Sequence, residues 1–255
     1  MLPQLNMYDK LSHKEKSAIK FDFFITFLTK SKEFYSYLMT KQERADFIRK
    51  KLKKLYPKPK PPLEFKNPFT LLIAVLLSAQ CTDDRVNIVT KELFKVADTP
   101  KKMKALGEKK IYKIIKSCGL APKKSKAIMQ TSQILIEQYK SKIPKSLSEL
   151  EKLPGVGHKT ASVVLNQAFG YPTFAVDTHI HRLAQRWGLS KGKNVQQTEL
   201  DLKKLFPKES WGDLHLQIIF YGRENCPARD CYGLKCDICS SLFPKRRSKV
   251  ITNKA

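Results

Sequence analysis

Residues 153–161 constrain the fold of this chain more than any other segment. They read Leu-Pro-Gly-Val-Gly-His-Lys-Thr-Ala, with helical patterns on either side. Proline ends a helix, and Gly155 and Gly157 can adopt backbone conformations that other residues avoid. The segment therefore predicts a hairpin of two helices joined by a tight turn, at about residues 150–168.

The turn of this hairpin is a candidate site for an anion. Backbone amides of the turn and of the helix that follows have no partners inside the helix. With the helix dipole they favour an anionic oxygen, which on DNA would be a backbone phosphate. The structural alternative is an ordinary corner in which the glycines only permit the bend. The residues expected to contact DNA here are Gly155, Val156, Gly157, His158 and Thr160.

The rest of the chain predicts an all-α fold. Apolar residues recur at helical spacing, Gly and Pro interrupt them, and no convincing strand alternation is found in the sequence. Asn67-Pro68 predicts a helix start, and residues 69–79 are apolar on every side, as in a central buried helix. Gly119 and Gly170 are expected to end two further helices.

The charge of the chain points to a polyanionic partner. Lys and Arg number 49 against 23 Asp and Glu, which gives a formal charge of +26. Such basicity is expected on nucleic acid or, less often, on an anionic membrane. The longest dense apolar stretch, residues 71–77, is far shorter than the roughly 20 residues of a bilayer helix. The ten lysines between Lys101 and Lys126 are expected to face either phosphate or water.

The cysteines are unevenly distributed. Cys81 and Cys118 lie alone in apolar helical patterns and are expected to be small buried hydrophobes. No targeting segment is evident, so a cytoplasmic, nucleoid-associated location in a bacterium is expected. In that setting, crowded cysteines indicate a metal rather than disulfides. The candidate ligands are Cys226, Cys231, Cys236 and Cys239.

The hairpin and three further motifs resemble the endonuclease III family of DNA glycosylases, in the same order along the chain. Residues 76–83 (Leu-Leu-Ser-Ala-Gln-Cys-Thr-Asp) resemble the first signature of that family. Residues 175–180 (Ala-Val-Asp-Thr-His-Ile) resemble its catalytic-aspartate motif, and Gly222-Arg223 resembles the lead into its iron–sulfur loop. The resemblance covers about residues 60–240 and includes the helix-hairpin-helix.

The resemblance implies a bifunctional enzyme of base excision repair, a DNA glycosylase and a lyase at abasic sites (AP lyase). Lys159 would attack C1′ of the damaged nucleotide as a neutral amine and form a Schiff base, and β-elimination would then nick the strand. Asp177 would stabilise positive charge on the sugar and accept the amine proton, with helix capping as the structural alternative. The implied substrate is duplex DNA with oxidised pyrimidines or abasic sites, bound by a monomer.

The target base must leave the duplex before it can react. Gln80 and Leu120 are expected to fill the gap, and His179 is expected to contact DNA. Gln80 could instead donate hydrogen bonds at a helix end, and Leu120 could be a core contact. Residues 121–125 are expected to form a loop.

The cysteine loop departs from the family pattern. That pattern has six, two and five residues between cysteines that hold a [4Fe–4S] cluster. Here the intervals are four, four and two, and Lys245 stands where the last cysteine would fall. An intact cluster with altered spacing, zinc on four thiolates and a loop without metal all remain open.

The expected organisation has two helical domains. Residues 61–171 would form a six-helix domain that carries the hairpin. Residues 41–60 together with 172–240 would form the second domain, which includes the cysteine loop at 226–239. Residues 1–40 would be an extension of unknown role, and residues 241–255 a basic tail. DNA would lie across the cleft between the domains.

Two other functions remain open. An adenine or thymine-mismatch glycosylase could use the same fold, although Lys159 disfavours it. A non-catalytic helix-hairpin-helix module could bind DNA without chemistry, but it would leave the Asp177 motif unexplained.

Overall fold

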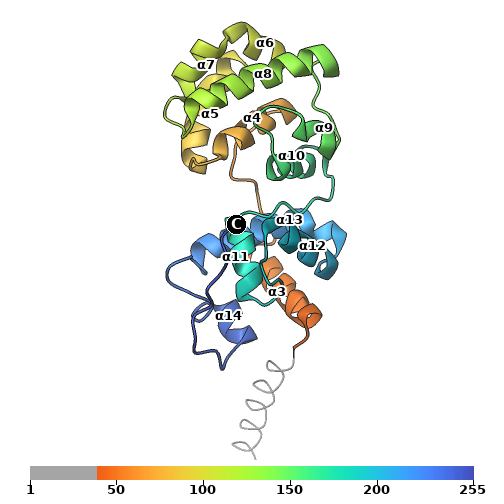
Figure 1. Cartoon of the computed structure of the whole chain (residues 1–255), viewed down its shortest axis with the longest axis vertical. Coiled ribbons are helices and arrows are strands. Elements are labelled where there is room, and N and C mark those ends of the chain that lie inside the picture. Colours follow the sequence, from red (N-terminus) through yellow and green to blue (C-terminus); the bar gives the residue numbers. More distant parts are fainter. Residues whose placement is uncertain (1–38) are drawn as a thin grey trace, which may run out of the picture.

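The computed structural model describes residues 39–255, and this part of the chain folds into twelve α-helices, one short 3-10 helix and no β-strand. The expectation of an all-α fold is confirmed. Figure 1 shows the helices gathered at the two ends of an elongated molecule, with two connecting segments between them. Of the expected extension, only Met39 and Thr40 lie within the described residues, and Thr40 caps the first described helix.

The hairpin lobe, residues 68–169, occupies one end of the molecule (Figure 1). Its core is a single apolar cluster centred on α4, which is buried along residues 69–77. Asn67 and Thr70 form a capping box at the start of α4, and Pro68 occupies its first turn, as the sequence predicts. The helices of this lobe are α4 (Pro68–Ser78), α5 (Asp83–Val96), α6 (Pro100–Leu106), α7 (Glu108–Ile115), α8 (Ala121–Tyr139), α9 (Leu147–Glu151) and α10 (His158–Phe169).

The terminal lobe combines residues 41–55 with residues 178–242 and has a second apolar core. Trp187 and Tyr221 are fully buried in it, with ring centroids 6.0 Å apart. Residues 243–255 pack back onto this lobe, where the amide of Val250 donates to the Tyr232 carbonyl. The helices of this lobe are α3 (Lys41–Leu55), α11 (Thr178–Arg186), α12 (Val195–Leu205), η1 (Lys208–Ser210), α13 (Trp211–Glu224) and α14 (Asp237–Leu242).

Three local expectations differ from the structure. The helix expected to end at Gly119 ends earlier, at Ile115, with Lys116 as its C-cap. Residues 61–171 contain seven helices rather than six, because Gly107 adopts a φ of 79° and divides α6 from α7. Residues 121–125 form the first turn of α8 rather than a loop, since Pro122 lies in that first turn, where its missing amide costs nothing. Among the described residues, no helix combines the length and hydropathy needed to cross a membrane.

Candidate active site

The predicted hairpin is formed by α9, the turn and α10. Gly155 has a φ of 78°, a conformation that favours glycine, and a Cβ there would lie a tight 3.1 Å from the Ala127 Cβ. The first hydrogen bond of α10 runs from the Ala161 amide to the Gly157 carbonyl, which leaves the preceding amides open at the helix end. Val156, a predicted DNA contact, has a buried side chain, and its amide donates a 3.0 Å hydrogen bond to the Leu153 carbonyl.

Lys159 and Asp177 lie close together between the two lobes. Nζ of Lys159 is 4.0 Å from Oδ2 of Asp177, and the lysine side chain is 54% exposed against 10% for the aspartate. The other oxygen, Oδ1, accepts a hydrogen bond of 2.8 Å from the Ile180 amide at the start of α11. The two roles considered for Asp177 are therefore compatible, because one oxygen caps the helix while the other faces the amine.

His215 supports the segment that carries Asp177, and the sequence offered no motif to indicate it. Its Nδ1 donates a 2.7 Å hydrogen bond to the Ala175 carbonyl, two residues before the aspartate. Burial lowers the pKa of His215, more than the Asp177 charge and the hydrogen bond to Ala175 raise it. A buried, neutral imidazole thus holds the backbone leading into α11.

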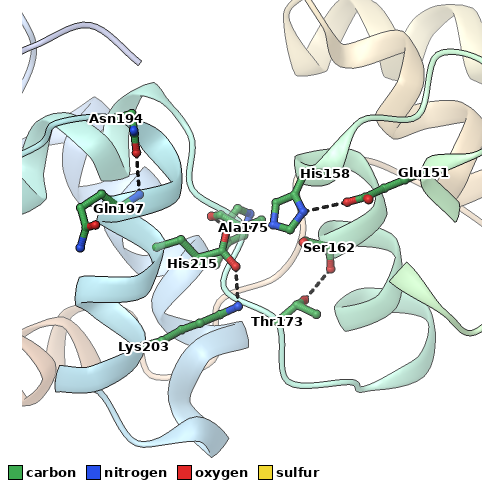
Figure 2. A network of polar contacts seen from close by, with 10 residues as sticks. Glu151, His158, Ser162, Thr173, Ala175, Asn194, Gln197, Lys203 and His215 are labelled. Atoms are coloured by element: carbon green, nitrogen blue, oxygen red, sulfur yellow. Dashed lines mark hydrogen bonds and ion pairs between the residues drawn. The ribbon is translucent and has the colours of Figure 1, made fainter. Parts of the chain in front are cut away.

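His158, a predicted DNA contact, joins the two lobes. Its Nδ1 lies 2.8 Å from a Glu151 oxygen, and its Nε2 lies 3.0 Å from an oxygen of Glu199 on α12. Glu199 also pairs with Lys203. Figure 2 shows His158 turned toward Glu151, with Lys203 on the opposite lobe. Burial alone would lower the pKa of His158, but the two carboxylates outweigh it and raise the pKa.

Gln80 and Leu120 lie on two adjacent loops of the hairpin lobe. Both have left-handed backbones, with φ of 53° and 61°, although neither is glycine. Leu120 is 46% exposed, which is inconsistent with the alternative of a core contact. Gln80 also lines a cavity of about 600 Å³, whose lining includes Asp83 of α5 and Arg223 of α13. These last two side chains form an ion pair of 2.8 Å between the lobes.

His179 is the remaining predicted DNA contact. It is half-buried on the first turn of α11, and its Nδ1 accepts a 3.2 Å hydrogen bond from Arg182. Burial lowers its pKa despite the nearby Asp177. The open hairpin amides, Lys159 and Asp177 are thus grouped between the lobes, while Gln80 and Leu120 are presented on separate loops.

The four loop cysteines converge although they are spread over 14 positions of the sequence. All four are buried, and their Sγ atoms lie within 4.8 Å of one another. Arg186 donates a 3.2 Å hydrogen bond to the Cys226 sulfur, and the Cys236 amide donates to the Cys231 sulfur. Cys231 thus takes part in the cluster despite its unexpected place in the sequence. The donor set is suited to a thiophilic metal.

Known proteins resemble this chain in sequence and in structure. The family described as "HhH-GPD superfamily base excision DNA repair protein" matches residues 73–208. The endonuclease III of Treponema pallidum (strain Nichols) is 48% identical over 186 residues, 72% of this chain and 88% of that protein. The endonuclease III of Escherichia coli (strain K12) is 47% identical over 191 residues, 75% of this chain and 90% of that protein.

The structural similarity extends over both lobes. A solved non-covalent endonuclease III–DNA complex matches with a TM-score of 0.74 and 40% identity, over 79% of this chain and 94% of that chain. Sequence identity of this size, spread over most of both proteins and joined to the same helical fold, confirms the resemblance noted in the sequence. This chain belongs to the endonuclease III family of helix-hairpin-helix base excision DNA repair proteins.

Proposed function

We propose that this chain removes damaged bases, chiefly oxidised pyrimidines, from duplex DNA as a monomer and then cleaves the strand at the resulting abasic site. The observation that carries the proposal is the 4.0 Å approach of the Lys159 amine to the Asp177 carboxylate. A nucleophile and a proton acceptor stand together at the N-terminal end of α10, beside the open amides of the hairpin. That combination suits attack on a sugar whose neighbouring phosphate is held in place.

The chemistry follows from these groups. Asp177 accepts a proton from Lys159, whose neutral amine attacks C1′, and the C1′–N bond breaks as the base leaves. Opening of the sugar ring gives a Schiff base between Lys159 and C1′. The imine acidifies the C2′ hydrogen; its loss expels the 3′ phosphate and nicks the strand. Water then hydrolyses the imine and restores the amine.

DNA contact is supported by the similar proteins and by charge. One similar structure is described as a trapped endonuclease III–DNA covalent intermediate, with a TM-score of 0.74 and 40% identity. The formal charge of +26 favours a polyanion. In this chain the hairpin amides would bind a phosphate, and Gln80 and Leu120 would occupy the space left by the extruded base.

Borohydride trapping on a duplex with one thymine glycol tests the proposal. The wild type and Lys95→Ala, a control for an exposed lysine on α5, are expected to form a covalent adduct and a nicked strand. Lys159→Ala is expected to form neither. Base release that survives Lys159→Ala would point to a water-dependent glycosylase, and intact binding without adduct on an abasic duplex would point to a non-catalytic module.

We also propose that the four loop cysteines bind a metal ion, and that it is a single tetrahedral ion such as Zn²⁺. With Zn–S bonds of about 2.3 Å, tetrahedral thiolates stand about 3.8 Å apart. A [4Fe–4S] cluster carries each thiolate on a different iron and sets them roughly 6 Å apart. The Sγ atoms of Cys226 and Cys239 are 4.0 Å apart, and the upper limit for all pairs is 4.8 Å. These distances support one ion; no step of the base chemistry requires it.

A further inference from the structure

Lys124 is a buried ammonium that the proposed chemistry does not use. It lies in the first turn of α8 and is only 5% exposed, unlike a lysine that faces water or phosphate. Its Nζ donates to the carbonyls of Leu77 and Ala79, at 2.7 and 2.6 Å. Burial lowers the pKa of Lys124. The cost of burying this charge is offset by two short hydrogen bonds to backbone oxygens.

The two carbonyls that Lys124 binds lie where α4 ends. The last carbonyls of a helix have no partners inside the helix, and a cation near them is favourable. Ala79 is the C-terminal cap of α4, and the chain then enters the left-handed conformation of Gln80. Lys124 therefore holds the backbone immediately before Gln80.

The second loop is held less directly. Leu120 is the left-handed N-cap of α8, and its carbonyl accepts a 3.0 Å hydrogen bond from the backbone amide of residue 124, a helix bond that does not depend on the lysine side chain. The two loops touch each other, since a Cβ at Gly119 would lie 2.6 Å from the Gln80 carbonyl oxygen. A left-handed conformation in a non-glycine residue persists only where its surroundings enforce it. The Lys124 side chain holds the loop of Gln80 directly, and the loop of Leu120 packs against that loop at Gly119.

We propose that Lys124 is a positioning residue for base extrusion, which holds the loops of Gln80 and Leu120 so that both side chains can enter the duplex together. This inference rests on the proposed function. Lys124 is buried and so would not contact DNA itself. It takes no part in the proposed chemistry of Lys159 and Asp177. Loss of the Lys124 ammonium should therefore slow the reaction of a nucleotide that must be unstacked from a duplex. It should not slow the reaction of a nucleotide that is already unstacked.

Two substrates separate these roles. The first is a duplex with one thymine glycol, which requires extrusion; the second is a single-stranded oligonucleotide with one abasic site, which does not. Lys124→Met keeps the apolar stem and removes the ammonium, and Lys95→Met is the matched control. Single-turnover base release from the duplex should fall roughly 100-fold in Lys124→Met, as expected for misplaced groups. Borohydride trapping on the single strand should stay within about twofold of the wild type.

Two further measurements distinguish a loss of loop positioning from misfolding of the variant. Lys124→Gln retains a donor for one of the two carbonyls, and its rate on the duplex should lie between those of the wild type and Lys124→Met. A 2-aminopurine next to the lesion should brighten on binding to the wild type and the control, and much less on binding to Lys124→Met. The helical circular dichroism of each variant confirms that it is folded.

The outcomes distinguish this inference from the proposed function. If the wild type forms no adduct on either substrate, the proposed function fails. If the wild type forms adducts and Lys124→Met matches it on the duplex, only the role of Lys124 is wrong. An equal loss on both substrates in a folded variant would also overturn that role, because it would place Lys124 in the chemistry or in general DNA binding.

Discussion

Asp177 combines a structural and a chemical task in a single carboxylate. Its Oδ1 accepts from the Ile180 amide, and its Oδ2 faces the Lys159 amine. The sequence suggests both tasks but cannot apportion them, because Asp is a frequent helix cap and a frequent proton acceptor. In the folded chain the two oxygens point to different partners, which makes the two tasks separable by mutation.

We expect Asp177→Asn to separate them. Asparagine can still accept from the Ile180 amide, so the free energy of unfolding in urea should change by less than about 0.5 kcal/mol. Without the carboxylate, strand cleavage of an abasic duplex should fall roughly 100-fold or more. Asp177→Ala loses the cap as well, and should lower the free energy of unfolding by about 1 kcal/mol. Cleavage at the wild-type rate in Asp177→Asn would show that this residue only caps the helix.

At the scale of elements, the loop between α13 and α14 departs from the cysteine spacing of the family pattern. Its cysteines are redistributed in sequence, yet α14 begins directly after Cys236 and brings Cys239 toward Cys226. Burial of all four thiols in the core of the terminal lobe couples their packing to the stability of that lobe. The metal content of the purified protein therefore tests directly what this loop binds.

The proposed ion predicts a definite metal content. Protein purified without oxygen should contain about one zinc per chain, with no visible absorption from an iron–sulfur cluster. Cys231→Ser should lose most of that zinc and lower the thermal midpoint of unfolding, whereas Cys81→Ser, outside the cluster, should retain the zinc. About four irons per chain, with the corresponding colour, would contradict a single ion and favour the cluster.

At the scale of the whole molecule, the two lobes are joined near the hairpin by a protonatable contact. His158 of the hairpin lobe lies between Glu151 of its own lobe and Glu199 of the terminal lobe, and Lys203 pairs with Glu199. The folded-state pKa of His158 is raised above the unfolded value of about 6.5. Its contribution to stability is therefore full below that value and is lost as the pH rises through the folded-state pKa.

This contact predicts a pH-dependent difference between the wild type and His158→Gln. Thermal unfolding should show the wild type to be more stable at about pH 6, with the difference shrinking by about pH 8.5. Glu199→Gln should remove much of the same pH dependence, while His215, whose pKa is shifted the other way, remains in both proteins. A difference that grows with rising pH would contradict a protonated His158 between the carboxylates.

The features of the fold that depend on residues close together in the sequence were predicted correctly. The helix start at Asn67-Pro68, the glycine turn of the hairpin and the end of α10 at Gly170 agree with the structure. Each depends on residues within a few positions of one another, through capping, missing amides or glycine conformations. The number of helices in residues 61–171 was predicted wrongly, because a single glycine such as Gly107 does not by itself distinguish a bend within one helix from a break between two.

The sequence by itself determined the all-helical fold found in residues 39–255, the helix-hairpin-helix and the resemblance to the endonuclease III family, because these follow from local periodicity and contiguous motifs. Only the tertiary structure decided what distant residues do together. It brought Cys231 to the other cysteines, set His158 between two carboxylates and buried Lys124 among backbone carbonyls. The physical reason is that a lysine, histidine or cysteine has several stable uses, and its burial and its partners, which are non-local, select among them.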